Sequence, residues 1–129
     1  MKRYSLHRIG NLLALRAAVF GKRGVRVVRL LVDTGSTYTI LPDEVLYSIG
    51  LDPSSSNERA RLITGSGYLI APRLEVQKFS CLGHVAENFK VVAHTLPPES
   101  FVDGLLGTDF LSLVKAIINV ESGEIEVAL

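Results

Sequence analysis

Apolar residues in this chain occur mostly in short runs rich in valine, leucine and isoleucine, and glycine, proline, serine and asparagine separate the runs. Short apolar runs between frequent turn signals predict strands rather than long helices. One run, Val25–Val32, alternates at first and then becomes wholly apolar, which is typical of a strand entering a two-sided core. The strands that we expect span residues 11–20, 25–32, 37–41, 61–64, 68–71, 73–79, 84–93, 116–120 and 124–129.

Two short helices interrupt this pattern. Pro42 followed by Asp43 and Glu44 predicts a helix start, because proline fits the first helical position and acidic side chains interact favourably with the helix dipole. Gly50 is the expected end of that helix. A second helix is expected over residues 108–114. Short strands with two brief helices indicate an all-β fold, and a small closed barrel fits best.

Residues 61–71 predict a β-hairpin with a glycine-rich tip. Arg61–Thr64 forms one arm, Gly65-Ser66-Gly67 turns, and Tyr68–Ala71 returns. Pro72 has no backbone N–H, so it limits how far the returning strand can pair on both sides.

Size and charge narrow the classes of protein. A chain of 129 residues fits a single domain over residues 1–129, and the formal net charge of +1 gives no reason to expect nucleic acid as a partner. No segment approaches the ~20 apolar residues that span a bilayer. The one cysteine, Cys81, cannot form an internal disulfide and is expected to be a packed thiol. We therefore expect a cytoplasmic protein without a membrane contact in this segment.

Three histidines show no spacing typical of a metal site, and no second cysteine supports zinc, so we expect no metal and no other cofactor. Two aspartates near the C-terminus have simple structural interpretations. Asp103 is expected to start a turn, and Asp109 to stabilise the first turn of the helix over residues 108–114.

The candidate chemistry lies where an apolar strand ends. Asp33 follows Leu30–Val32 directly, and Thr34, Gly35 and Ser36 come next. A carboxylate at the end of a buried strand is unfavourable unless its site is built to hold it. Two hydroxyl groups and the close backbone approach that glycine permits would provide such a site. Taken alone, this aspartate is equally compatible with a turn or a helix cap.

About seventy residues later, Leu105-Leu106-Gly107 lies within the run Asp103–Leu111. The order of an apolar strand, Asp-Thr-Gly-Ser, a glycine-tipped hairpin and this Leu-Leu-Gly segment resembles that of the retropepsin-like (retroviral-type, single-lobe) aspartic proteases. The resemblance covers most of the chain. It implies a small closed retropepsin-like barrel with one lobe per chain, in which the Leu-Leu-Gly segment supports the catalytic loop from behind.

The resemblance implies that Asp33 is catalytic. Peptide hydrolysis needs an activated water and a proton donor, and two adjacent carboxylates supply both because they cannot both ionise. The chain has one such aspartate, so a homodimer in which Asp33 meets its copy is the simplest completion. By resemblance, Thr34 would hold the two loops in register and Gly35 would point its N–H at the carboxylates. Ser36 would donate to the outer carboxylate oxygen, which favours an acidic pH optimum.

The hairpin resembles the flap that closes over substrate in this family, and an extended peptide would bind beneath it as an added strand. The residues expected to form the flap and to bind substrate are Ile63, Thr64, Gly65, Ser66 and Gly67. Ile40, Ile63 and Leu105 are expected to line its pockets. By the same resemblance, residues 124–129 are expected to pair across the dimer, as the terminal strands of viral enzymes do.

We therefore expect an aspartic endopeptidase that hydrolyses a protein or peptide substrate as a homodimer. Two alternatives stay open. The chain could be a non-catalytic binding or assembly module that keeps the protease fold. It could also be a very narrowly specific processing enzyme that acts on one partner or on itself.

Overall fold

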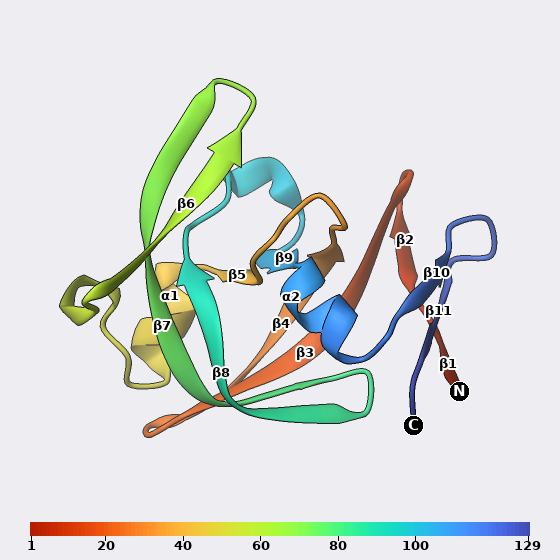
Figure 1. The fold of residues 1–129 in the computed structure, drawn as a ribbon, viewed down its shortest axis with the longest axis horizontal. Coiled ribbons are helices and arrows are strands. Elements are labelled where there is room, and N and C mark those ends of the chain that lie inside the picture. The colour runs from red at the N-terminus through yellow and green to blue at the C-terminus, as the bar shows by residue number, and fades with distance from the viewer.

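Eleven strands and two short α-helices make up the fold (Figure 1). The structure is a computed structural model and describes residues 1–129. The strands are β1 (Lys2–Ser5), β2 (His7–Ile9), β3 (Leu12–Gly21), β4 (Gly24–Val32), β5 (Ile40–Leu41), β6 (Glu58–Thr64), β7 (Gly67–Cys81), β8 (His84–Ala93), β9 (Gly104–Leu106), β10 (Ile117–Asn119) and β11 (Glu124–Val127). The helices are α1 (Asp43–Ser48) and α2 (Thr108–Leu113), with 3-10 turns at Pro53–Ser55 and Pro98–Ser100. Neither α-helix has the length or the apolar character of a membrane-spanning segment.

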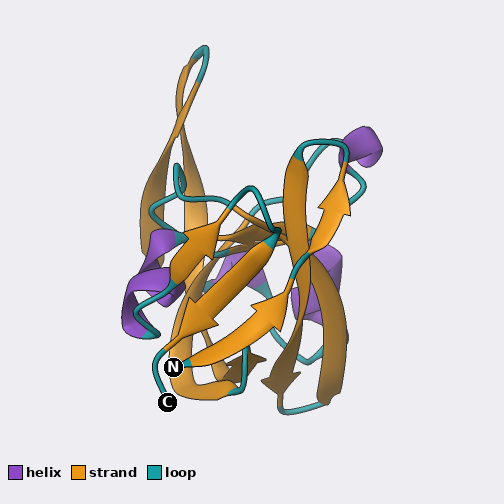
Figure 2. Ribbon diagram, turned by 90° about the vertical axis from the view of Figure 1, so that its right-hand side faces the viewer, coloured by secondary structure: helices purple, strands orange, loops and turns teal.

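Most strands belong to one sheet with the order β2-β3-β4-β9-β5-β8-β7-β6. An additional pairing of β3 with β7, centred on Val19 and Phe79, folds this sheet back on itself. The remaining strands form a separate sheet, β1-β11-β10, beside the two chain termini. Strands rather than helices occupy this side of the molecule (Figure 2).

The core lies between the folded sheet and the two helices. Phe79 of β7, Phe89 of β8 and Phe110 of α2 form an aromatic cluster with ring centroids 5.1 to 5.8 Å apart. Leu30 of β4 and Leu106 of β9 are fully buried in the same core. Strand β4 runs parallel to β9, from Leu30 beside Gly104 to Val32 beside Leu106. Because both strands pack into the core, this pairing sets the position at which β4 ends. The residue that follows β4 is Asp33.

The predicted all-β fold with two short helices is confirmed, and the strand expected over residues 84–93 is β8. Pro72 acts as expected, because the β7–β8 ladder begins at the next residue, Arg73. Two expectations were wrong: residues 68–71 and 73–79 form one continuous strand, and the segment 37–41 is a strand only at Ile40–Leu41. Strands β1, β2 and β9 were not predicted.

Candidate functional site

Asp33 lies on a tight loop held by backbone hydrogen bonds. Its N–H donates to the Leu106 carbonyl at 3.0 Å, and its own carbonyl accepts the Ser36 N–H at 3.2 Å. The Gly35 N–H donates to Asp33 Oδ1 at 2.9 Å, as the sequence analysis expected. Asp33 is half-buried, whereas Thr34 is exposed at the loop surface. The loop therefore presents one fixed, accessible carboxylate.

The segment Leu105–Gly107 packs directly behind this loop. The Thr108 N–H donates to the Ser36 carbonyl at 2.8 Å. A Cβ on Gly107 would lie 2.5 Å from both the carbonyl carbon and the oxygen of Tyr38, a separation that no side chain tolerates. Glycine is therefore required here by close approach, and the segment supports the loop from behind.

A buried polar contact that the sequence analysis missed joins the same two segments. Thr39 is fully buried, and Asp109 of α2 accepts both of its donors: Thr39 Oγ1 donates to Oδ1 at 2.7 Å and Thr39 N–H donates to Oδ2 at 2.9 Å. The Gly107 N–H in turn donates to Thr39 Oγ1 at 3.2 Å. Asp109 lies in the first turn of α2, as expected, and its carboxylate also ties the helix to Thr39, which follows the Asp33 loop. The one signal of this contact in the sequence was the position of Thr39, a polar residue directly before the apolar pair Ile40–Leu41.

Ser36 does not make the contact expected of it. Its hydroxyl donates to the Tyr38 carbonyl at 2.7 Å. A hydroxyl carries a single hydrogen, so in this arrangement Ser36 cannot also donate to the outer oxygen of Asp33. The serine stabilises the loop, and the reason for expecting an acidic optimum is removed.

Asp33 opens into a cleft of about 320 Å³. The cleft is lined by loop residues, by the β6–β7 hairpin, by the segment after β8 and by β9: Asp33, Gly35, Ser36, Thr37, Tyr38, Ile40, Arg61, Leu62, Ile63, Thr64, Leu69, His94, Leu96 and Leu105. It brings together the expected pocket residues Ile40, Ile63 and Leu105, and Asp33 is its single acidic residue. Two larger hollows lie elsewhere: one of about 530 Å³ beside β1 to β4 has no carboxylate in its lining, and one of about 580 Å³ beside β6 and β7 is lined by Asp52, Glu58 and Glu75. In the second hollow the Glu58 carboxylate is paired with Arg73 and Lys90.

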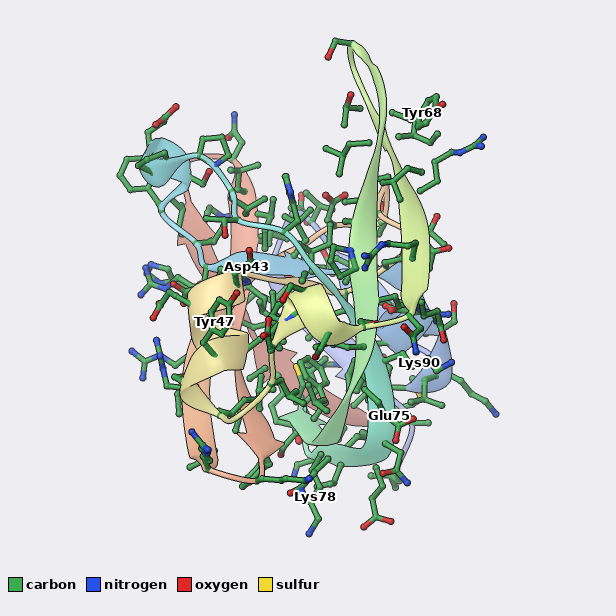
Figure 3. The ribbon with its side chains drawn as sticks, turned by 90° about the vertical axis from the view of Figure 1, so that its left-hand side faces the viewer. Asp43, Tyr47, Tyr68, Glu75, Lys78 and Lys90 are labelled. Carbon is green, nitrogen blue, oxygen red and sulfur yellow. The ribbon has the colours of Figure 1, made fainter.

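The β6–β7 hairpin projects from the body of the molecule (Figure 1), and residues of both its arms line the cleft. Thr64 pairs with Gly67 at the tip, where Gly65, Ser66 and Gly67 are exposed and do not line the cleft. Ile63 is 79% exposed near the tip, and Tyr68 and Ile70 on the returning arm are also exposed. Tyr68 lies on the returning arm, away from the body (Figure 3), and the Arg61 guanidinium lies 4.6 Å from its ring centroid.

Charged contacts hold the base of this hairpin to β8. The Glu58 carboxylate accepts from Lys90 Nζ at 2.9 Å and from Arg73 Nη1 at 3.0 Å. The hydrogen bond from Lys90 is the main cause that lowers the pKa of Glu58 below its ordinary value, and the bond from Arg73 acts in the same direction. No group of three or more His, Cys, Asp or Glu side chains converges closely enough to hold a metal ion.

Two comparisons show which known proteins the chain resembles. A family model described as aspartyl protease matches residues 16–110, a stretch that includes Asp33, the hairpin and Leu105–Gly107. The chain is similar in structure to a retropepsin-like aspartic protease from Rickettsia conorii, with a TM-score of 0.70 and 19% sequence identity. That match covers 96% of this chain and 88% of the other. No curated protein sequence matches the chain.

Proposed function

The chain belongs to the aspartyl protease family, and we propose that it is an endopeptidase in which the Asp33 carboxylates of two identical copies form the catalytic pair. The observation that carries this proposal is the placement of Asp33. It is the single acid of an apolar-lined cleft, and the Gly35 N–H holds its carboxylate. One acid cannot serve as base and proton donor at once, so the site is completed by a second copy related by a two-fold axis.

In this dimer the two carboxylates share one proton, because like charges a few ångströms apart do not both ionise. The ionised Asp33 removes a proton from a water molecule, whose oxygen attacks the carbonyl carbon of the scissile peptide. The protonated Asp33 stabilises the developing oxyanion. As the C–N bond breaks, the proton that was taken from water passes to the departing nitrogen. The Gly35 N–H keeps the carboxylate oriented throughout, and the exposed Thr34 is available to contact its copy.

We further propose that the β6–β7 hairpin is the flap. Both arms of the hairpin line the cleft and Ile63 is exposed, which supports this role, since closure over a peptide would bury that side chain. An extended substrate would add a strand between the hairpin and the cleft floor, with its side chains alternating into the apolar lining. Such a site favours substrates with apolar residues beside the scissile bond.

The test is cleavage of an unstructured peptide pool between about pH 3 and pH 8, the range in which paired carboxylates titrate. Wild type is compared with Asp33→Asn and with Asp43→Asn, which changes an exposed aspartate on α1 (Figure 3). Cleavage should vanish in the first variant and persist in the second. If a folded, dimeric wild type cleaves nothing, the chain is a binding module or acts on a single substrate. Equal cleavage by wild type and Asp33→Asn would refute the mechanism.

A further inference from the structure

The terminal sheet restricts how two copies can pair. Strand β11 lies in its centre, with Lys2–Ser5 of β1 on one side and Ile117–Asn119 of β10 on the other. Both edges of β11 are therefore used within the chain. The expectation that residues 124–129 pair across a dimer is wrong for Glu124–Val127, because these residues have no free backbone edge to offer. Only β1 and β10 leave an edge of this sheet open.

The two open edges differ in charge. Strand β1 carries Lys2 and Arg3, both exposed, and charged side chains protect a strand edge from pairing with another chain. Strand β10 carries no charge, and Ile117 is 59% exposed. The next residue, Val120, is 62% exposed. Just past the strand, the Arg8 guanidinium donates to the Val120 carbonyl at 2.6 Å, so the uncharged edge suited to a partner strand is Ile117–Asn119 itself.

Strand β10 is also the edge that the chain connects to the catalytic loop. It follows α2, and α2 is tied to the loop by the Thr108–Ser36 backbone hydrogen bond and by the Asp109–Thr39 contact. Strand β1 leads instead into β2, at the outer end of the large sheet. A two-fold dimer has a single axis, so the strand pairing and the meeting of the Asp33 side chains have to share it. Strand β10 follows α2, which supports the loop, so the edge of β10 is the one placed to share this axis.

We propose that a second copy of this chain pairs antiparallel along β10, which joins the two terminal sheets in the order β1-β11-β10-β10-β11-β1. This inference rests on the proposed homodimeric function and specifies its interface. Pairing centred on Ile118 places Ile117 opposite Asn119 of the second copy. The turns that hold Lys115 and Glu121 lie just outside the two ends of β10, so antiparallel pairing also brings the Lys115 turn of one copy near the Glu121 turn of the other, twice by symmetry. Both residues are exposed and neither belongs to an ion pair within the chain.

Disulfide trapping distinguishes the two edges. Ile117→Cys combined with Asn119→Cys places thiols on the exposed face of β10, where each would lie opposite the other position of the second copy. The control combines Arg3→Cys with Ser5→Cys, which are both exposed and would lie opposite each other in a β1 self-paired about Tyr4. The native Cys81 does not interfere, since it is buried and its pKa is raised to about 12. Thiol labelling of the reduced, folded variants verifies that the introduced cysteines are accessible.

Mild oxidation should give a covalent dimer of the β10 variant and none of the β1 variant. A covalent dimer of the β1 variant, or no dimer of the β10 variant, would overturn the interface. Peptide cleavage by the wild type, compared with Asp33→Asn, reports on the proposed function separately. If wild type cleaves and the β10 variant does not cross-link, the interface is wrong and the function stands. If the β10 variant cross-links and wild type never cleaves, the interface stands and the function is wrong.

The register has its own test. Lys115→Glu should raise the dissociation constant of the dimer about ten-fold, because two exposed attractive contacts become repulsive. Adding Glu121→Lys in the same chain should restore the wild-type value, since the charges are then exchanged. Failure of the second substitution to restore dimerisation would overturn the pairing centred on Ile118.

Discussion

Removal of the Asp109 carboxylate should weaken the fold far more than removal of an ordinary helix-start acid. In Asp109→Ala, the Thr39 N–H and hydroxyl lose the oxygens that accept them at 2.9 and 2.7 Å, and Thr39 is fully buried. A buried donor without an acceptor costs about 1–3 kcal/mol. Asp109 is itself only half-buried, so water can reach part of the vacated space. We therefore expect the free energy of unfolding to fall by about 2–4 kcal/mol, out of a total of about 5–15 kcal/mol for a typical domain.

Asp43→Ala is the matched control. Asp43 is also a first-turn acid, on α1, but its side chain is exposed and accepts no hydrogen bond. The loss of a favourable charge at a helix start is worth about 0.3–1 kcal/mol, and this part is common to both variants. The excess loss in Asp109→Ala therefore measures the contact with Thr39 together with the Phe110 N–H, which donates to Asp109 Oδ1 at 2.8 Å. Asp109→Asn should be intermediate, because an amide has one oxygen to accept and its NH₂ group faces a donor.

Urea unfolding followed by circular dichroism gives the free energies, and the peptide-cleavage rate gives the effect on the site. Because Thr39 follows the catalytic loop, the turnover number of Asp109→Asn should fall in a protein that remains folded. If Asp109→Ala loses no more stability than Asp43→Ala, the buried contact has no energetic role. If Asp109→Asn keeps the full turnover number, the contact does not position the loop.

Three other measurements test the packing and the charges. Gly107→Ala should lower the free energy of unfolding by about 1–3 kcal/mol because its Cβ would lie 2.5 Å from the Tyr38 carbonyl. Gly65→Ala should not lower the free energy of unfolding in this way, because its Cβ would meet nothing within 4 Å. Equal losses of stability in the two variants would contradict the close approach at Gly107. Cys81, with its pKa raised to about 12 by burial, should resist alkylation at pH 8 until the chain unfolds, so rapid native labelling would contradict its burial. The pKa of Glu58 is lowered from 4.5, so its stabilisation is present above that pH and is lost as the pH falls through the folded-state pKa. Glu58→Gln should therefore reduce the acid-side decline in melting temperature, and an unchanged decline would show that the ion pairs contribute nothing.

Local signals predicted most of the elements that carry the site. The apolar run before Asp33 predicted a strand that enters the core, and Pro42 with two acidic residues predicted α1. The glycines at 65 and 67 predicted the hairpin tip. Each of these features depends on residues that are neighbours in the sequence, which is why a pattern of a few residues was sufficient.

The features that were missed depend on partners far away in the chain. Strand β1 is short and polar, and it exists because Lys2–Ser5 pairs with β11 at the opposite end of the sequence. Strand β9 is three residues long and is defined by its place between β4 and β5. Asp109 showed its helix position in the sequence, but its contact with Thr39, seventy residues earlier, required the folded chain. The hydroxyl of Ser36 was expected to donate to Asp33, and only the folded loop shows that it donates to the Tyr38 carbonyl.

The central claim is that catalysis needs two Asp33 carboxylates from two copies of the chain. The most direct measurement is the peptide-cleavage rate of a fixed amount of wild type mixed with increasing amounts of inactive Asp33→Asn, after subunits have exchanged. Mixed dimers contain one aspartate, so a three-fold excess of the variant should lower the rate to about a quarter of its starting value. A rate that stays constant at every ratio would mean that one chain catalyses alone, and it would contradict the account.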